Sequence, residues 1–408
     1  MVKIDGGVTS PKGFKAAGLR AGIKAGKTNK DMAMIYSDVP AAAAGTFTKN
    51  VVKAAPVLWD KKLVENEKLA QAVVINSGIA NACTGDEGYE NSAKTAEITG
   101  NVLGINPAQV LVASTGVIGF TLPMDIIEKG VNELAKVLGD SREDSIAAAE
   151  AILTTDTHKK EIAYEVEISG TKVTLGAMCK GSGMIHPNMG TMLGFITTDA
   201  DIEQELLDKA LKSCIDDTFN MVSVDGDTST NDTVLILANG MAGNKKITSE
   251  DADYETFKEA LLEINTYLAK QIAQDGEGAT RLFQVDVVNA ASIAQAKVLA
   301  KSIVTSNLTK CAIYGKDANW GRILCAMGYS GAEFDPYKVD ITVSSEKGSI
   351  KLVENGKATA FDEETATEIL SPEVVIATAD IKMGEAKATA WGCDLTYDYV
   401  KINADYRS

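Results

Sequence analysis

The sequence predicts a mixed α/β protein built from layered sheets. Segments rich in β-branched and apolar residues recur through both halves of the chain. Between them lie segments of about 12 to 20 residues with apolar positions at helical spacing. Sheets and helices of this kind bury their apolar faces by stacking in layers. With 408 residues, 45% of them hydrophobic and 24% charged, the chain can bury a large core, and we expect two lobes.

In chain order, the first half is expected to begin with short strands within 3–27, strands at 31–37 and 44–47, a helix over 56–69 and a strand over 71–75. A helix over 90–103, a strand over 109–113, helices over 123–138 and 143–153, and a strand over 172–178 are expected to follow. The second half is expected to hold a strand over 191–198, a helix over 203–219, a strand over 234–238, helices over 254–273 and 290–303, and strands over 339–343, 374–381 and 395–402. Neither a fixed repeat nor a low-complexity linker divides the chain.

The charge and the hydropathy exclude several classes of partner. The net charge of −16 argues against a nucleic-acid partner, because phosphate backbones attract basic surfaces. No apolar run approaches the roughly 18 residues that cross a bilayer, and the N-terminal residues lack the apolar region of a signal peptide. We therefore expect a cytoplasmic protein without a membrane partner.

Cysteine and histidine usage narrows the chemistry. The six cysteines are scattered without a Cys-x-x-Cys pair, so we expect neither a zinc site nor a disulfide framework, but small buried side chains. They are Cys83, Cys179, Cys214, Cys311, Cys325 and Cys393. The chain has two histidines, His158 and His186, so a histidine-activated nucleophile has few candidates. Acyl-transfer chemistry would more naturally use another base.

The stretch from Lys180 to Ala200 joins a glycine-punctuated loop, which carries a lysine and a histidine, to a segment typical of a buried strand. Thr191 lies where the loop becomes the strand. The preceding Gly190 can adopt backbone conformations closed to other residues. The Gly190-Thr191 bond is therefore a candidate for a strained, cleavable peptide bond, and the alternative is a surface threonine in a hairpin.

Three further segments could carry chemistry. The strand at 109–113 ends in Ser114-Thr115-Gly116, where a glycine lets backbone N–H groups turn toward an oxyanion; the alternative is an ordinary turn. The threonines of 154–157 surround an acid and could bind a polar substrate or cap a helix. Glu277 lies between two glycines, which suits a ligand with an amino group approaching from outside, or a helix C-cap.

Metal and nucleotide sites are not expected. The polar loop at 222–233 is rich in acids but lacks the spacing of a calcium-binding EF-hand. The segment 314–322 lacks the Gly-x-x-x-x-Gly-Lys-Ser/Thr order of a phosphate loop, and 180–190 lacks the third glycine of a dinucleotide fingerprint.

Taken together, these motifs resemble those of the ornithine acetyltransferase family of arginine biosynthesis, also called the bifunctional glutamate N-acetyltransferase family. The resemblance spans nearly the whole chain. It rests on Gly6-Gly-Val-Thr-Ser-Pro-Lys-Gly-Phe-Lys, Asn76-Ser-Gly with Ala80-Asn-Ala-Cys-Thr-Gly, Ser114-Thr-Gly-Val-Ile-Gly, Thr154-Thr-Asp-Thr, Lys180-Gly-Ser-Gly-Met-Ile, Thr191-Met-Leu, Asp225-Gly-Asp-Thr-Ser-Thr-Asn-Asp, Gly276-Glu-Gly-Ala-Thr, Asp317-Ala-Asn-Trp-Gly-Arg and Asn403-Ala-Asp-Tyr-Arg.

The resemblance implies a layered α-β-β-α sandwich whose precursor cleaves itself between Gly190 and Thr191. The products would be an α chain (1–190), with the oxyanion and substrate loops, and a β chain (191–408), which begins with the nucleophile. The two chains would be intertwined rather than independent domains. The family also implies a heterotetramer of two α and two β chains.

The resemblance further implies that the enzyme transfers an acetyl group from N2-acetyl-L-ornithine to L-glutamate through an acetyl-Thr191 intermediate. The α-amine of Thr191 would be the general base, since its ordinary pKa of about 7.7 to 8.0 lies near working pH. Thr115 and the Gly116 N–H would stabilise the oxyanion. The family's substrate-binding positions correspond here to Thr157, Lys180, Thr191, Glu277, Asn403 and Ser408. No bound cofactor or metal is implied, and acetyl-CoA is left open as a second acetyl donor.

Four positions depart from the usual family pattern. Gly190 replaces a common alanine, Ile79 a polar residue, and Ser408 a frequent threonine, and His158-Lys159 stands where x-Pro is usual. None of these changes removes a catalytic group. Two other readings remain open: a self-processed amidohydrolase or aminopeptidase, in which water resolves the acyl-enzyme, and a non-catalytic binding protein with an uncleaved chain.

Overall fold

The fold was analysed in a computed structural model that describes residues 1–186 and 192–405. The predictions for Gly190, Thr191 and Ser408 lie outside the described residues. Strands among the described residues form a nine-stranded and a seven-stranded sheet.

The nine-stranded sheet has the order β1-β6-β7-β8-β10-β3-β4-β5, with β2 paired to β3. Its strands are β1 (Val2–Ile4), β2 (Phe14–Leu19), β3 (Met32–Phe47), β4 (Leu69–Ile79), β5 (Val110–Val117), β6 (Lys160–Ile168), β7 (Thr171–Lys180), β8 (Leu193–Thr198) and β10 (Thr233–Ala238). The sheet mixes parallel pairs, such as β4 with β5 and β8 with β10, with antiparallel ones.

Strand β3 joins the two halves of this sheet. Its first part, 32–36, pairs with β4, and its last part, 42–47, pairs with β10, with a register shift between Tyr36 and Ala41. The two halves thereby face each other across a shared apolar core, to which β4 contributes Val73 and Ile75 among others.

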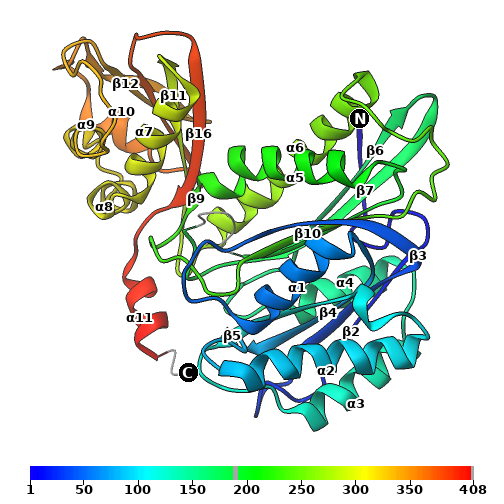
Figure 1. Ribbon diagram of the computed structural model, residues 1–408. Coiled ribbons are helices and arrows are strands. Elements are labelled where there is room, and N and C mark those ends of the chain that lie inside the picture. The colour runs from blue at the N-terminus through cyan, green and yellow to red at the C-terminus, as the bar shows by residue number, and fades with distance from the viewer. Residues whose placement is uncertain (187–191, 406–408) are drawn as a thin grey trace.

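Helices cover the outer faces of both halves, which completes an α-β-β-α sandwich (Figure 1). Helices α2 (Gly85–Leu103) and α3 (Met124–Lys136) cover the half formed by β2 to β5. Helices α5 (Gln204–Asp217) and α6 (Ala252–Gln274) cover the half that contains β6, β7, β8 and β10. Helices α1 (Ala55–Asn66) and α4 (Arg142–Ala151) contribute side chains to the inner core. The predicted fold class is confirmed.

The alternation of side chains along a strand explains why the central strands are apolar on both sides. Side chains of consecutive strand residues point to opposite faces of a sheet. In β10, Val234 and Ile236 belong to the core under α5 and α6, whereas Leu235 and Leu237 belong to the inner core. Full burial of such a side chain contributes on the order of 1.5 to 3 kcal/mol, so both faces stabilise the sandwich.

The seven-stranded sheet has the order β14-β13-β12-β15-β11-β16-β9 and forms most of the smaller lobe in Figure 1. Its strands are β9 (Val222–Ser223), β11 (Leu282–Ala290), β12 (Asp340–Ser345), β13 (Gly348–Glu354), β14 (Lys357–Ala358), β15 (Val374–Asp380) and β16 (Ala386–Cys393). The remaining helices are α7 (Ile293–Thr305), α8 (Asn307–Gly315), α9 (Trp320–Gly328), α10 (Glu363–Ile369) and α11 (Tyr397–Asp405), with short 3-10 turns at Pro107–Gln109 and Phe219–Met221.

Several predicted elements differ from the structure. The predicted strand at 395–402 is helix α11, because the place on the sheet is taken by β16, which pairs with β11 and β9. The predicted strands at 31–37 and 44–47 are the single strand β3. The helix predicted over 290–303 begins at Ile293, since Ala290 still pairs in β11. Strands β6, β9, β11, β13, β14 and β16 and helices α8, α9 and α10 were not predicted.

The prediction that all cysteines are buried was also wrong. Cys179, Cys214 and Cys393 are buried, whereas Cys83, Cys311 and Cys325 are exposed. The exposed cysteines lie in a turn before α2 and on the short helices α8 and α9. On α8 and α9 the buried positions are taken by other residues, such as Ile313 and Ile323, and the cysteines lie on the exposed side.

Candidate active site

A cavity of about 150 Å³, lined by both polar and apolar side chains, lies where the end of β5 meets loops from both halves of the chain. Its lining includes most of the described residues that the sequence singled out. The full lining is Thr115, Gly116, Ile118, Thr154, Thr155, Lys180, Gly183, Met184, Ile185, Met192, Leu193, Ser229, Thr230, Asn231, Asp232, Glu277 and Asn403. Met192 and Leu193 directly follow position 191 in the chain, so the cavity lies next to the predicted cleavage position in sequence.

Thr115 and Gly116 reach the cavity as part of a strand. The sequence predicted a turn here, but both residues belong to β5 and pair with Ser77 and Gly78 of β4. Gly116 has φ +130°, and a Cβ atom built on it would lie 2.3 Å from the carbonyl carbon of Gly78. Only glycine can therefore occupy this position without moving the neighbouring strand.

Asn231 fastens the ends of β4 and β5 behind this pair. Its Nδ2 donates to the carbonyl oxygens of Ala80 and Ser114, at 2.6 and 2.8 Å. Its Oδ1 accepts a hydrogen bond from the Thr230 hydroxyl at 2.6 Å. Asn231 is buried, so these bonds are shielded from water. The amide thus fixes the carbonyl immediately before Thr115.

Glu277 and Asn403 form a second wall of the cavity. The sequence suggested a glutamate open to approach from outside, but Glu277 is only 8% exposed. Its Oε2 accepts a hydrogen bond from Asn403 Nδ2 of α11 at 2.7 Å. Its backbone N–H donates to the Ser182 carbonyl at 3.0 Å. A Cβ on Gly183 would lie 2.3 Å from the carboxylate, so the absence of a side chain at 183 makes room for Glu277.

Thr157, predicted to bind substrate, lies outside this lining. Its hydroxyl donates to Asp275 at 2.5 Å, and it lines a second cavity of about 510 Å³ beside α11 together with His158. Thr154 and Thr155 of the same motif line the first cavity instead. The motif thus reaches the cavity, through its first two threonines.

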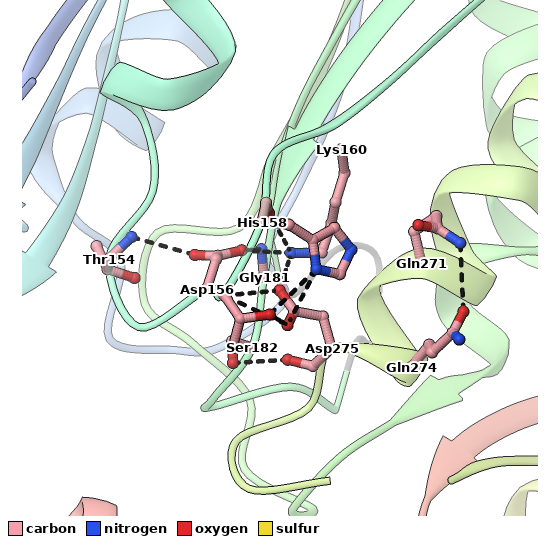
Figure 2. A network of polar contacts seen from close by, with 10 residues as sticks. Thr154, Asp156, His158, Lys160, Gly181, Ser182, Gln271, Gln274 and Asp275 are labelled. Carbon is pink, nitrogen blue, oxygen red and sulfur yellow. Dashed lines mark hydrogen bonds and ion pairs between the residues drawn. The ribbon is translucent and has the colours of Figure 1, made fainter. Parts of the chain in front are cut away.

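Lys180 lies close enough to Asp156 to act on the charge of its carboxyl, and Figure 2 shows other contacts of Asp156. Burial raises the pKa of Asp156, but Lys180 and Lys160 outweigh burial and hold the pKa of this carboxyl well below its ordinary value. Burial also lowers the pKa of Lys24 to about 8, and its Nζ donates to the Leu153 carbonyl at 2.6 Å. Asp156 therefore stays ionised beside the lysines near the cavity.

The loop between β9 and β10 supplies four lining residues that sequence reasoning did not select, Ser229, Thr230, Asn231 and Asp232. Asp225 at the start of this loop accepts backbone hydrogen bonds from Met184 and Ile185, at 2.7 and 2.9 Å. Those bonds explain an acid in the loop without a metal, and no His, Cys, Asp and Glu side chains among the described residues group into a metal site. The high density of polar residues in this loop was the sequence signal that could have identified it as part of the site.

The fold and the cavity define an α-β-β-α sandwich protein with a cavity lined by polar and apolar side chains from both halves of the chain. Comparison with known proteins identifies the family. The model of the ArgJ family matches residues 15–408, and the chain belongs to the ArgJ family.

Two curated relatives match almost their whole length. One, from Clostridium acetobutylicum, is named arginine biosynthesis bifunctional protein ArgJ 1; it is 54% identical over 401 residues, which are 98% of this chain and 97% of that protein. The other, arginine biosynthesis bifunctional protein ArgJ from Symbiobacterium thermophilum, is 53% identical over 406 residues, 99% of each chain.

A solved structure gives the same family. The crystal structure of an arginine biosynthesis bifunctional protein argJ from Bacillus halodurans is 48% identical, with a TM-score of 0.51; the match covers 53% of this chain and 100% of that chain.

Within residues 1–186 and 192–405, no helix has both the length and the apolar content to span a bilayer.

Proposed function

We propose that this enzyme transfers the acetyl group of N2-acetyl-L-ornithine to L-glutamate, giving ornithine and N-acetylglutamate in arginine biosynthesis. Full-length similarity to proteins named bifunctional ArgJ, at about half identity, is the observation that carries this function. The cavity supports this function, because Lys180, Glu277 and the end of β5 at Thr115 and Gly116 all line it. An amino-acid substrate presents a carboxylate and an ammonium that these charges complement.

We assign the nucleophile to the hydroxyl of Thr191, exposed as an N-terminal residue by cleavage of the Gly190-Thr191 bond. The free α-amine of Thr191 then takes the hydroxyl proton, which a backbone amide could not do. Attack on the acetyl carbonyl forms a tetrahedral oxyanion, which Thr115 and the Gly116 N–H stabilise. Collapse breaks the C–N bond, and the proton held by the α-amine goes to the departing amine of ornithine.

The second half of the reaction reverses the first with a new amine. The amino group of glutamate attacks the acetyl ester on Thr191, and its proton passes to the α-amine. The C–O bond then breaks, and the α-amine gives this proton to the threonine oxygen, which restores the hydroxyl. In this scheme Lys180 binds the substrate carboxylate, Glu277 binds the side-chain ammonium of ornithine, and Asn403 orients Glu277. Thr157 and Ser408 remain proposed substrate contacts by family resemblance. Such a covalent intermediate produces ping-pong kinetics.

We further propose acetyl-CoA as a second acetyl donor for glutamate, with no other bound cofactor. The name "bifunctional" of the relatives supports this proposal. The proposed assembly is a cytoplasmic heterotetramer of two α chains (1–190) and two β chains (191–408). Strands β7 and β8, on either side of the cleavage position, are neighbours in one sheet, so cleavage would leave the two chains held together.

A denaturing gel and a product assay test the proposal. Purified protein should migrate as two fragments of roughly half of 43.1 kDa, and Thr191→Ala should stay full-length. Ornithine release from N-acetylornithine should require glutamate. Equal release without glutamate would identify a hydrolase instead, and an active but uncleaved wild type would refute the N-terminal amine as base. Glutamate acetylation with acetyl-CoA alone tests the second donor.

A further inference from the structure

A buried lysine joins two buried carboxylates behind the wall of the cavity. Lys160, the first residue of β6, is 1% exposed. Its Nζ lies 2.7 Å from Asp156 Oδ1 and 2.5 Å from Asp275 Oδ2. Both carboxylates are also buried, with side chains 0% and 3% exposed. Figure 2 shows the lysine between the two acids, which come from the loop after α4 and the end of α6.

Asp156 connects this ion cluster to two loops of the cavity. Its Oδ1 accepts a hydrogen bond from the backbone N–H of Gly181 at 2.7 Å, in the loop that begins at Lys180. Its Oδ2 accepts one from the backbone N–H of Thr154 at 3.1 Å. Thr154 and Lys180 both line the cavity. A single carboxylate thus sets the spacing of two lining segments that are distant in sequence.

Asp275 connects the same cluster to the segment that carries Glu277. Its backbone carbonyl accepts a hydrogen bond from the Ser182 hydroxyl at 2.7 Å, and the Glu277 N–H donates to the Ser182 carbonyl at 3.0 Å. Its carboxylate also accepts from Thr157, and the ring of the exposed His158 lies 3.5 Å away. The third lining segment is therefore tied to the lysine as well.

The charges explain why the lysine is needed. Burial lowers the pKa of Lys160, but Asp156 and Asp275 outweigh burial and raise it, so the ammonium persists. Without it, Asp275 would lose its buried ammonium partner and Asp156 would keep only the attraction of Lys180, and breaking a buried ion pair typically costs about 3 to 5 kcal/mol. A buried ion cluster contributes little net stability compared with apolar packing of equal volume. Its value here lies in the geometry that it imposes on the three loops.

We propose that Lys160 is a positioning residue for substrate binding: through Asp156 and Asp275 it holds Thr154, Lys180 and Glu277 at the spacing that the substrate requires. This inference rests on the proposed acetyl transfer. It predicts an effect on KM rather than kcat, because none of these contacts reaches Thr115 or Gly116 on β5. A displacement of about 1 Å in groups that position a substrate can cost on the order of 100-fold, and here we expect that cost in KM.

The test compares Lys160→Met with Leu134→Ala, a variant in which a fully buried side chain of α3 is truncated. Both lose stability, but only the first loosens the cavity loops. Steady-state kinetics with N-acetylornithine and glutamate give KM and kcat, normalised to the cleaved protein. Hydrogen exchange by mass spectrometry follows the segments 152–159, 180–185 and 275–278. Because Lys160→Met could fail to fold, Asp275→Asn, which keeps the side-chain shape, is measured in parallel.

We expect KM for N-acetylornithine to rise about 10- to 100-fold in Lys160→Met and less in Asp275→Asn, with kcat within about threefold of wild type. Exchange should accelerate in the three segments together. Leu134→Ala should keep the wild-type KM. If the folded variants lose stability but keep KM, or if kcat alone falls, the inference is wrong. An inactive wild type would instead refute the proposed function.

Discussion

Replacing Gly116 by alanine tests the oxyanion site most directly. A Cβ at this position would lie 2.3 Å from the Gly78 carbonyl carbon and 2.5 Å from its oxygen. An ordinary contact begins near 3.4 Å, so the two paired strand ends must separate by roughly 1 Å. The new side chain would also hold φ +130°, a conformation that L-residues disfavour.

The expected consequence is a loss of kcat. A shift of about 1 Å in groups that contact the reacting carbonyl costs on the order of 100-fold in rate, equivalent to about 2.7 kcal/mol of transition-state stabilisation. KM for N-acetylornithine should change little, since Lys180 and Glu277 lie on other segments. The assay is the initial rate of ornithine formation at saturating N-acetylornithine and glutamate, per mole of cleaved enzyme.

Gly119→Ala is the matched control. Gly119 also has a positive φ, +94°, but a Cβ there meets no heavy atom within 4 Å. Both variants therefore carry backbone strain, and only Gly116→Ala adds a collision with β4. Equal kcat values in the two variants would refute the argument that the close approach to Gly78 sets the oxyanion geometry.

Three further outcomes are expected. Asn231→Ala leaves the buried carbonyls of Ala80 and Ser114 without their donor, so it should lower stability by about 2 to 5 kcal/mol and reduce kcat; an unchanged melting temperature would contradict this role. Glu277→Gln keeps an acceptor for its partner but loses the charge, so KM for N-acetylornithine should rise about 10- to 100-fold, as measured by steady-state kinetics. Burial lowers the pKa of His186 to about 4, below its ordinary value of about 6.5, so the unfolded chain binds the proton first and stability is lost as pH falls through this range. Thermal melts should therefore show a smaller loss of stability in acid for His186→Gln than for wild type, and equal losses would contradict the effect of partial burial on this ring.

Local sequence patterns predicted most elements, because the spacing of apolar residues and the turn residues that end an element are local properties of the chain. The long helix at 254–273 and the strand at 234–238 were predicted nearly at their observed bounds. The failure at 395–402 has a tertiary cause. The segment Leu-Thr-Tyr-Asp-Tyr-Val-Lys-Ile has the composition of a strand, but the strand before it, β16, already lies between β11 and β9. The segment instead forms a helix that brings Asn403 to Glu277.

For the site as well, the sequence predicted one part and only the tertiary structure determined the other. The sequence by itself determined the layered α/β class, the family and the motifs that hold Thr115, Gly116, Lys180, Glu277 and Asn403, because residue types and their order carry that information. Only the tertiary structure decided that Thr154 and Thr155, rather than Thr157, line the cavity. It also brought Lys160 between two acids more than a hundred residues apart in the chain, since long-range contacts are created by packing and leave no periodic trace in the sequence.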